Sequence, residues 1–170
     1  MKERGATLVE VMLVAALILA LAAAFGVPGY RSYAASRASA DAATTLASDL
    51  AFLVRAAQNA GGDEGASLVI ESQDPLSYRG YLGRPTSVDP NAKLGAILIE
   101  RTFGGVSLAG APISTTTPLL FATNGSAQFV NGGNIAPQHQ TIQFVLICSA
   151  GGKAAQVDLD LFTGAVTTGT

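Results

Sequence analysis

Twenty consecutive residues, Val11 to Tyr30, carry no charge and are mostly alanine, leucine, valine and isoleucine. At about 1.5 Å per residue, a helix of this length spans roughly 30 Å, the thickness of a bilayer's hydrocarbon core. A helix that is apolar on every side at this length is typical of a membrane span rather than of a protein core. Gly26 and Pro28 lie near the end of the run, and we expect the helix to kink there.

The composition supports a membrane segment attached to a folded region. Of the 170 residues, 49% are apolar and 13% are charged, against about 25% charged in ordinary soluble domains. This length suits one domain with one appended element. The formal net charge of −2 gives no basic footprint of the kind that nucleic-acid-binding proteins carry. A single cysteine excludes an intrachain disulfide and a cysteine-cluster metal site.

The flanks of the apolar run favour a retained helix over a removed secretory signal. No small-x-small cleavage site follows the run, and a polar helical segment continues directly from Arg31. Lys2 and Arg4 precede the run, and positive charges of this kind remain on the cytoplasmic side. We therefore expect the N-terminus in the cytoplasm and most of the chain outside.

Glu10 is the residue that a plain membrane anchor does not explain. A lone carboxylate near the beginning of an apolar helix is costly, and intramembrane carboxylates usually have an identifiable partner. One interpretation places Glu10 at the membrane interface without a partner. The other pairs it with a positive group from another chain, because an amine and a carboxylate buried together cost less than either alone.

Residues 4–12 read Arg-Gly-Ala-Thr-Leu-Val-Glu-Val-Met, which resembles the class III signal of type IV pilins and type II secretion pseudopilins. The resemblance implies that a prepilin peptidase cuts between Gly5 and Ala6 and that the new amine of Ala6 is methylated. It also implies that Glu10, the fifth residue after the cut, compensates the amine of a neighbouring subunit during filament assembly. The stretch from Pro28 to Tyr33 resembles the Pro-x-Tyr-x-x-Tyr stretch of the same family.

The same resemblance implies partners and a location. The partners are other pilin or pseudopilin subunits, the prepilin peptidase and methyltransferase, and an inner-membrane assembly platform. The chain is expected to cross the inner membrane once before assembly and to lie in a periplasmic or cell-surface filament afterwards. Residues 46–53 resemble the helix of GspH/FimT-type minor subunits. The β-rich C-terminal region, which has no second cysteine to form a disulfide, resembles the same subgroup. The resemblance does not distinguish a pilus from a secretion pseudopilus or a competence machine.

The sequence predicts an α+β fold, with a long N-terminal helix packed on a C-terminal antiparallel β-sheet. Residues 31–60 are rich in alanine, with an apolar stripe at Leu46, Leu50, Leu53 and Ala57. The expected division is a leader at 1–5, a membrane or filament-core helix at 6–30, an amphipathic continuation at 31–62 and a β-rich region at 63–170. Residues 73–93 contain three prolines and are predicted to be a surface loop. The predicted strands are 66–71, 96–103, 119–122, 127–130, 141–148, 154–162 and 165–168, with hairpin turns at Asn124-Gly125, Gly151-Gly152 and Thr163-Gly164.

The β-rich region carries no recognisable catalytic motif. It has no Gly-x-Ser-x-Gly, phosphate-binding loop or metal-ligand spacing, so we expect neither enzymatic activity nor a cofactor. His139 is interpreted as a solvated loop residue and Cys148 as a buried structural thiol. Asp158 and Asp160 are predicted to share one face of a strand, which makes them candidate ligands for a cation such as Ca²⁺, although a solvated acidic face has the same pattern.

Two other functions compete with a filament subunit. One is contact with DNA during uptake, for which residues 78–84 provide Tyr78, Arg79, Tyr81 and Arg84 in one predicted loop. A solvated loop has the same composition, and the acidic chain argues against a nucleic-acid partner. The other is a membrane-anchored binding module that never polymerises. Such a module has no need of a carboxylate at Glu10.

Overall fold

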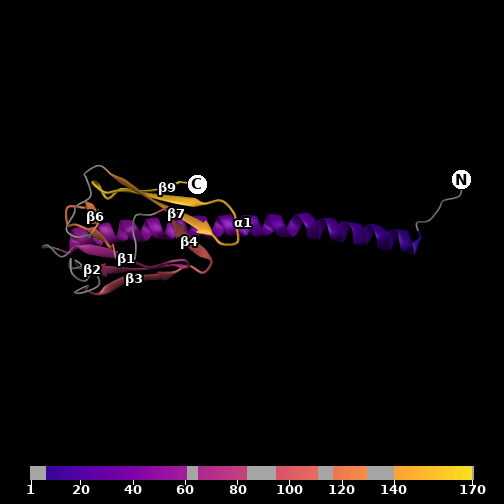
Figure 1. Ribbon diagram of the computed structural model, residues 1–170, viewed down its shortest axis with the longest axis horizontal. Coiled ribbons are helices and arrows are strands. Elements are labelled where there is room, and N and C mark those ends of the chain that lie inside the picture. Colours follow the sequence, from indigo (N-terminus) through magenta and orange to yellow (C-terminus); the bar gives the residue numbers. More distant parts are fainter. Residues whose placement is uncertain (1–6, 61–64, 84–94, 111–116, 130–139, 170) are drawn as a thin grey trace.

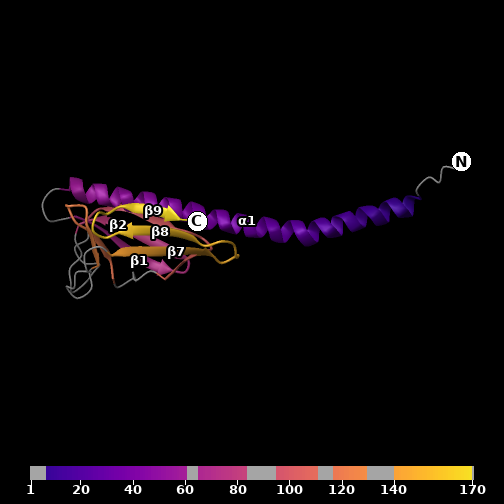
Figure 2. The same ribbon diagram turned by 90° about the horizontal axis from the view of Figure 1, so that it is seen from above.

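One long helix dominates the computed structural model, which describes residues 7–60, 65–83, 95–110, 117–129 and 140–169. Helix α1 runs from Leu8 to Asn59, a length of 52 residues or about 78 Å. It continues without interruption through Gly26 and Pro28, and Figure 2 shows its free half curving rather than breaking. The predicted long helix is confirmed, whereas residues 61 and 62, the end of the predicted amphipathic continuation, lie outside the described residues.

The two halves of α1 have different surroundings. Every residue from Leu8 to Ala34 is exposed, and Ala35 is the first buried one. Figure 1 shows this free half extending well beyond the β region. Leu46, Leu50 and Leu53 are fully buried, as the predicted apolar stripe requires. Because burying one leucine contributes about 1.5–3 kcal/mol, this stripe is a principal attachment of the helix to the strands.

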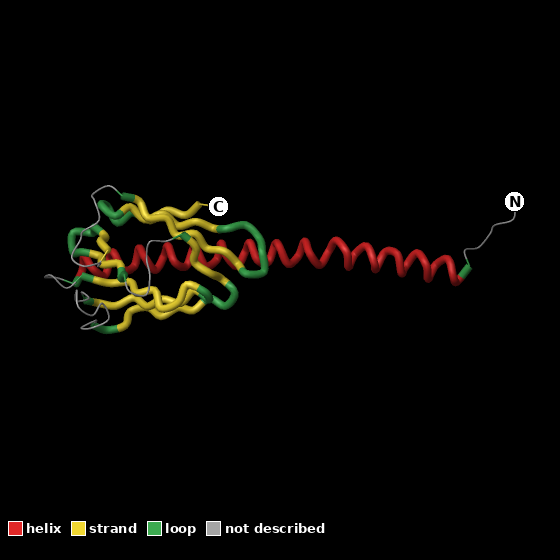
Figure 3. Tube along the Cα trace, in the orientation of Figure 1, coloured by secondary structure: helices red, strands yellow, loops and turns green. Residues whose placement is uncertain are grey.

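The described strands form two antiparallel sheets, where the sequence predicted a single one. Sheet A has five strands in the order β3-β2-β1-β5-β6, and sheet B has four in the order β4-β7-β8-β9. Helix α1 contacts strands of both sheets, and Figure 2 shows both sheets on the same side of the helix. Figure 3 separates the helical and β regions by colour. The strand bounds are β1 Ala66–Gln73, β2 Leu76–Leu82, β3 Ile97–Thr102, β4 Val106–Ala109, β5 Leu119–Phe121, β6 Ala127–Phe129, β7 Thr141–Cys148, β8 Ala155–Asp160 and β9 Val166–Gly169.

All seven predicted strands are confirmed, with bounds shifted by a few residues, but the loop predicted for 73–93 is wrong in part. Strand β2 lies within it and pairs with both β1 and β3. Its Leu76, Tyr78 and Gly80 are buried and alternate with half-buried residues, which is the pattern of a strand with one covered face. Strand β4, which pairs with β7, was not predicted at all.

The predicted hairpin turns are confirmed. Strands β5 and β6 pair across Asn124-Gly125, strands β7 and β8 across Gly151-Gly152, and strands β8 and β9 across Thr163-Gly164. Gly151 and Gly152 have φ angles of 88° and 106°, a left-handed region that glycine enters without strain. The β7–β8 turn therefore depends on its two glycines.

Candidate functional site

The free half of α1 is the most unusual surface of the described chain. Helix α1 is long and apolar enough to cross a membrane, and none of its most apolar stretch is buried against the rest of the molecule. A contiguous apolar surface of this kind marks a site of contact with membrane or protein. Its large exposed apolar residues are Leu8, Val9, Val11, Met12, Leu13, Val14, Leu17, Ile18, Leu19, Leu21, Phe25 and Val27.

Glu10 lies in the first turn of α1 and forms a capping box with Thr7. The Thr7 backbone N–H donates to Glu10 Oε2 at 2.8 Å, and the Glu10 N–H donates to Thr7 Oγ1 at 3.4 Å. These reciprocal bonds satisfy two of the donors that a helix N-terminus leaves unpaired. Glu10 thus has a local role in helix capping that was not predicted, although the Thr-x-x-Glu spacing is its usual sequence signal. Gly5 and Ala6, the predicted cleavage and methylation site, lie outside the described residues.

The β7–β8 hairpin holds α1 where the helix leaves the β region. The Lys153 N–H donates to Ser36 Oγ at 2.9 Å, and Ser39 Oγ donates to the Lys153 carbonyl at 2.8 Å. A side chain added at Gly152 would meet the Ser36 backbone nitrogen at 2.7 Å, so only glycine permits this approach. Both bonds use the backbone of Lys153 and leave its side chain uninvolved.

A partly buried polar cluster joins α1 to sheet A. Asp49 Oδ2 accepts a hydrogen bond from the Tyr78 hydroxyl at 2.9 Å and one from Arg101 Nε at 3.0 Å. Burial and, secondarily, the Asp49 carboxylate raise the pKa of the Tyr78 phenol far above its ordinary value, so it remains a donor. The bond to Asp49 also raises the pKa of the Arg101 guanidinium. The sequence gives no sign of this cluster, because Tyr78 and Arg101 lie 29 and 52 positions after Asp49.

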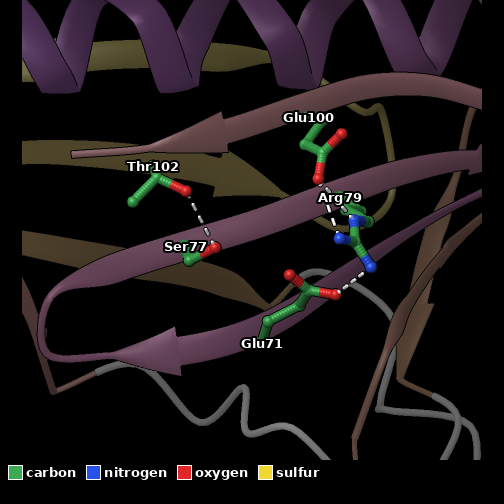
Figure 4. Close-up of polar contacts among 5 residues, drawn as sticks. All are labelled: Glu71, Ser77, Arg79, Glu100 and Thr102. Atoms are coloured by element: carbon green, nitrogen blue, oxygen red, sulfur yellow. Dashed lines mark hydrogen bonds and ion pairs between the residues drawn. The ribbon is translucent and has the colours of Figure 1, made fainter.

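The outer face of sheet A does not provide the DNA-contacting loop that the sequence suggested. Arg79 lies on β2 between two carboxylates, with Nη1 2.6 Å from Glu71 Oε1 and Nη2 2.8 Å from Glu100 Oε1 (Figure 4). Beside them, the hydroxyls of Ser77 and Thr102 are 3.3 Å apart. Tyr78 is fully buried and cannot stack on a base. Arg84 lies outside the described residues.

The predicted cation ligands Asp158 and Asp160 already accept hydrogen bonds from their own surroundings. Asp158 accepts from the Gln156 amide at 2.8 and 3.0 Å, and Asp160 Oδ1 accepts from the backbone N–H groups of Phe162 and Thr163 at 2.9 Å each. Within the described ranges, no group of three or more histidine, cysteine, aspartate or glutamate residues could hold a metal ion.

The other two residues singled out from the sequence have no site built around them. Cys148 is half-buried at the end of β7, so the prediction of a buried thiol is wrong. The strand ends there, and the last residue of a strand is less covered than its centre. His139 lies outside the described residues.

The comparisons identify no relative: no protein-family model, no curated protein and no solved structure matches this chain.

Proposed function

We propose that this chain is a structural subunit of a type IV pilus or a type II secretion pseudopilus, anchored and assembled through the free half of α1. The observation that carries the proposal is the complete exposure of the apolar residues from Leu8 to Ala34. Transferring one such leucine, valine, isoleucine or phenylalanine out of water contributes about 1.5–3 kcal/mol. A dozen of them along one helix drive it into a bilayer or among similar helices.

The apolar surface suits both of these environments in turn. In a bilayer, every backbone hydrogen bond of a helix is satisfied internally, so the free half needs no protein neighbour. In a filament, the same surface is covered by the corresponding helices of other subunits. The firmly packed second half of α1 then carries the β region on the outside of the filament.

The negative charge of Glu10 favours a subunit that assembles over one that is only anchored. After cleavage between Gly5 and Ala6, the new amine lies one residue before Thr7, and each subunit has one cation and one carboxylate near the same end. Pairing the Ala6 amine of one subunit with Glu10 of the next removes two isolated charges from an apolar environment. Glu10 is exposed in the single chain and is therefore accessible to a neighbour.

In this proposal the chain performs no chemistry of its own. It is a substrate of the prepilin peptidase and methyltransferase and a client of an inner-membrane assembly platform. Before assembly it is a single-pass inner-membrane protein with a cytoplasmic N-terminus. Nucleic acid is not proposed as a partner, because Arg79 and Arg101, the arginines of sheet A described here, are both paired with carboxylates.

A second candidate is a membrane-anchored module that does not polymerise, and the Thr7–Glu10 capping box favours it. The box gives Glu10 a purpose within one chain, so the carboxylate alone does not require a partner. The two candidates differ in what they require of Glu10. A filament subunit needs its negative charge, whereas an anchored module needs only a side chain that accepts the hydrogen bond from the Thr7 N–H.

Intact mass of the membrane-extracted protein tests the proposal directly. We expect a loss of Met1 to Gly5 and a gain of one methyl group when the chain is produced with a prepilin peptidase. The control is the same chain produced without the peptidase, which should retain its leader. A Gly5→Leu variant should also remain uncut, because it removes the predicted cleavage residue alone. An uncut parent chain in the presence of the peptidase would exclude the filament pathway and leave the anchored module.

A further inference from the structure

We propose that the tip of the β7–β8 hairpin, residues 149–154, seats the β region on the headgroups of an anionic membrane, with Lys153 contacting lipid phosphate. This inference rests on the membrane-anchored state of the proposed function. It concerns the orientation of the β region before assembly, which the apolar helix alone does not determine.

The position of the tip along α1 carries the argument. The uncharged run ends at Tyr30, and the exposed Tyr30 and Tyr33 are of the type that lies at a membrane–water interface. Ser36, which binds the hairpin, is six residues beyond Tyr30, or about 9 Å along the helix. The headgroup layer of one leaflet is about 5–8 Å thick. The hairpin tip therefore meets the outer surface of that layer.

Among the described hairpins, the shape of the molecule places this tip nearest the membrane. In Figures 1 and 2 the β7–β8 hairpin reaches further along α1 toward the N-terminus than the other described hairpins. The tip is formed by Ser149, Ala150, two glycines, Lys153 and Ala154, and all but one of these side chains are small. Lys153 is thus the one long side chain of the tip, and it is exposed.

The chemistry of the tip fits phosphate. Lys153 is exposed, and the described residues give its ammonium no ion pair. Arg31, five residues before Ser36 on α1, is a second exposed cation near this end of the β region. A nearby third cation, Arg37, is 3.9 Å from Asp41 and is partly compensated. Because the whole chain is acidic, a negatively charged membrane attracts the end of the β region that carries Lys153 and repels the rest of that region.

The attachment of the hairpin makes the inference testable. Ser36 and Ser39 bind the backbone of Lys153, so replacing its side chain leaves the hairpin held against α1. A change in membrane contact then reports the ammonium group and not a displaced loop.

The experiment measures the distance of the tip from the bilayer surface in the full chain. Cys148→Ser removes the only cysteine, and Ala150→Cys, at an exposed position in the turn, carries a bimane fluorophore. The chain is reconstituted in phosphatidylcholine vesicles with or without phosphatidylglycerol, and a nitroxide on the lipid headgroup quenches bimane that lies close to it. Flotation of the vesicles measures anchoring independently.

We expect stronger quenching with phosphatidylglycerol, and a decrease of the docked-to-undocked ratio by about fivefold or more in Lys153→Glu. Arg55→Glu is the matched control, because it makes the same charge change on an exposed residue. Arg55 lies about 28 Å further along α1 than Ser36, which binds the hairpin. Equal quenching in the parent and Lys153→Glu, or equal decreases in Lys153→Glu and Arg55→Glu, would overturn the headgroup seat while leaving the anchor intact. A parent chain that fails to float would instead refute the anchor, and the seat with it.

Discussion

Glu10 combines a negative charge with the length to reach the Thr7 N–H, and substitutions can separate the two. Glutamine at this position can still complete a capping box, whereas alanine cannot. If the charge of Glu10 compensates a neighbour's amine, Glu10→Gln and Glu10→Ala should both be absent from sheared filaments. Both variants should still be inserted in the membrane and cut after Gly5. Quantitative immunoblots of filament and membrane fractions give the comparison.

Thr7→Ala is the control for the capping box itself. It removes the hydroxyl that accepts the Glu10 N–H and costs the helix end about 1 kcal/mol, but it retains the carboxylate. We expect it to enter filaments. Filaments that contain Glu10→Gln and lack Thr7→Ala would assign Glu10 to helix capping and would favour the anchored module.

Asp49 is expected to be the most sensitive polar residue of the packed helix. Asp49→Ala leaves the buried Tyr78 hydroxyl without its acceptor and Arg101 without its carboxylate, which should lower the free energy of unfolding by about 2–3 kcal/mol. The estimate is below that for a fully buried pair because 48% of the Arg101 side chain is exposed and can be hydrated.

Asp41→Ala is the matched substitution on the same helix. Its side chain is 74% exposed and its contact with Arg37 is 3.9 Å long, so a change within about 0.5 kcal/mol is expected. Urea unfolding of the full chain in detergent, followed by circular dichroism of the sheets, measures both. Similar effects of the two variants would show that the Asp49 cluster contributes no more than a surface ion pair.

The two residues also show what the sequence reveals at this scale. Glu10 is conspicuous in the sequence because it is a lone carboxylate near the beginning of an apolar helix. Asp49 occurs in a helical segment that contains both polar and apolar residues, and nothing near it in the sequence indicates Tyr78 and Arg101 as its partners. Contacts between distant strands and a helix have no periodicity of their own, so a site of this kind requires the structure.

At the scale of elements, periodicity predicted the parts of the fold with unambiguous patterns. Strand β8 alternates buried and half-buried residues throughout, and glycine turns mark both of its ends. Strand β2 was missed because Pro75 precedes it and Gly80 interrupts it, and both residues are typical of loops. The structure explains Gly80 differently, as a point of close approach between β2 and α1.

Any side chain at Gly80 should therefore be destabilising. A Cβ atom there would lie 2.9 Å from Leu53 Cδ2 and 3.3 Å from Ile99 Cβ, and Leu53 is fully buried and has little space to move. We expect Gly80→Ala to destabilise the fold by about 1–2 kcal/mol through overpacking. The measurement is the urea midpoint of the full chain in detergent.

Gly104→Ala is the corresponding control in the turn between β3 and β4. Nothing lies within 4 Å of a Cβ atom at Gly104, so a change within about 0.5 kcal/mol or a slight stabilisation is expected. If Gly80→Ala were as stable as Gly104→Ala, Leu53 would have space to move aside, and β2 and α1 would not be tightly packed at Gly80.

At the scale of the whole molecule, the sequence predicted the order of helix and strands but not their division into two sheets. Hairpin signals are local and describe only neighbours in the chain. The central pairing of sheet A joins Ala66 to Phe121 and Leu68 to Leu119, across more than fifty residues. The transfer of the chain from β3 in sheet A to β4 in sheet B has no turn signature beyond two glycines. Long-range pairing of this kind depends on which faces are buried together, and a single sequence leaves that open.

The division of α1 predicts where the molecule can be cut. A chain that begins at Arg31 retains every buried residue of the helix, since the first is Ala35, and Ser32 is available as a new helix cap. We expect this chain to be a soluble monomer without detergent and to unfold cooperatively, because the described residues that it lacks are all exposed and most are apolar. A chain that begins at Ala47 loses Leu46 and the serines that hold the β7–β8 hairpin, and it should be at least about 3 kcal/mol less stable. Sedimentation and urea unfolding measure both properties. If the chain from Arg31 aggregated while the full chain in detergent kept its sheets, the free half of α1 would be part of the folded unit and not an independent assembly segment.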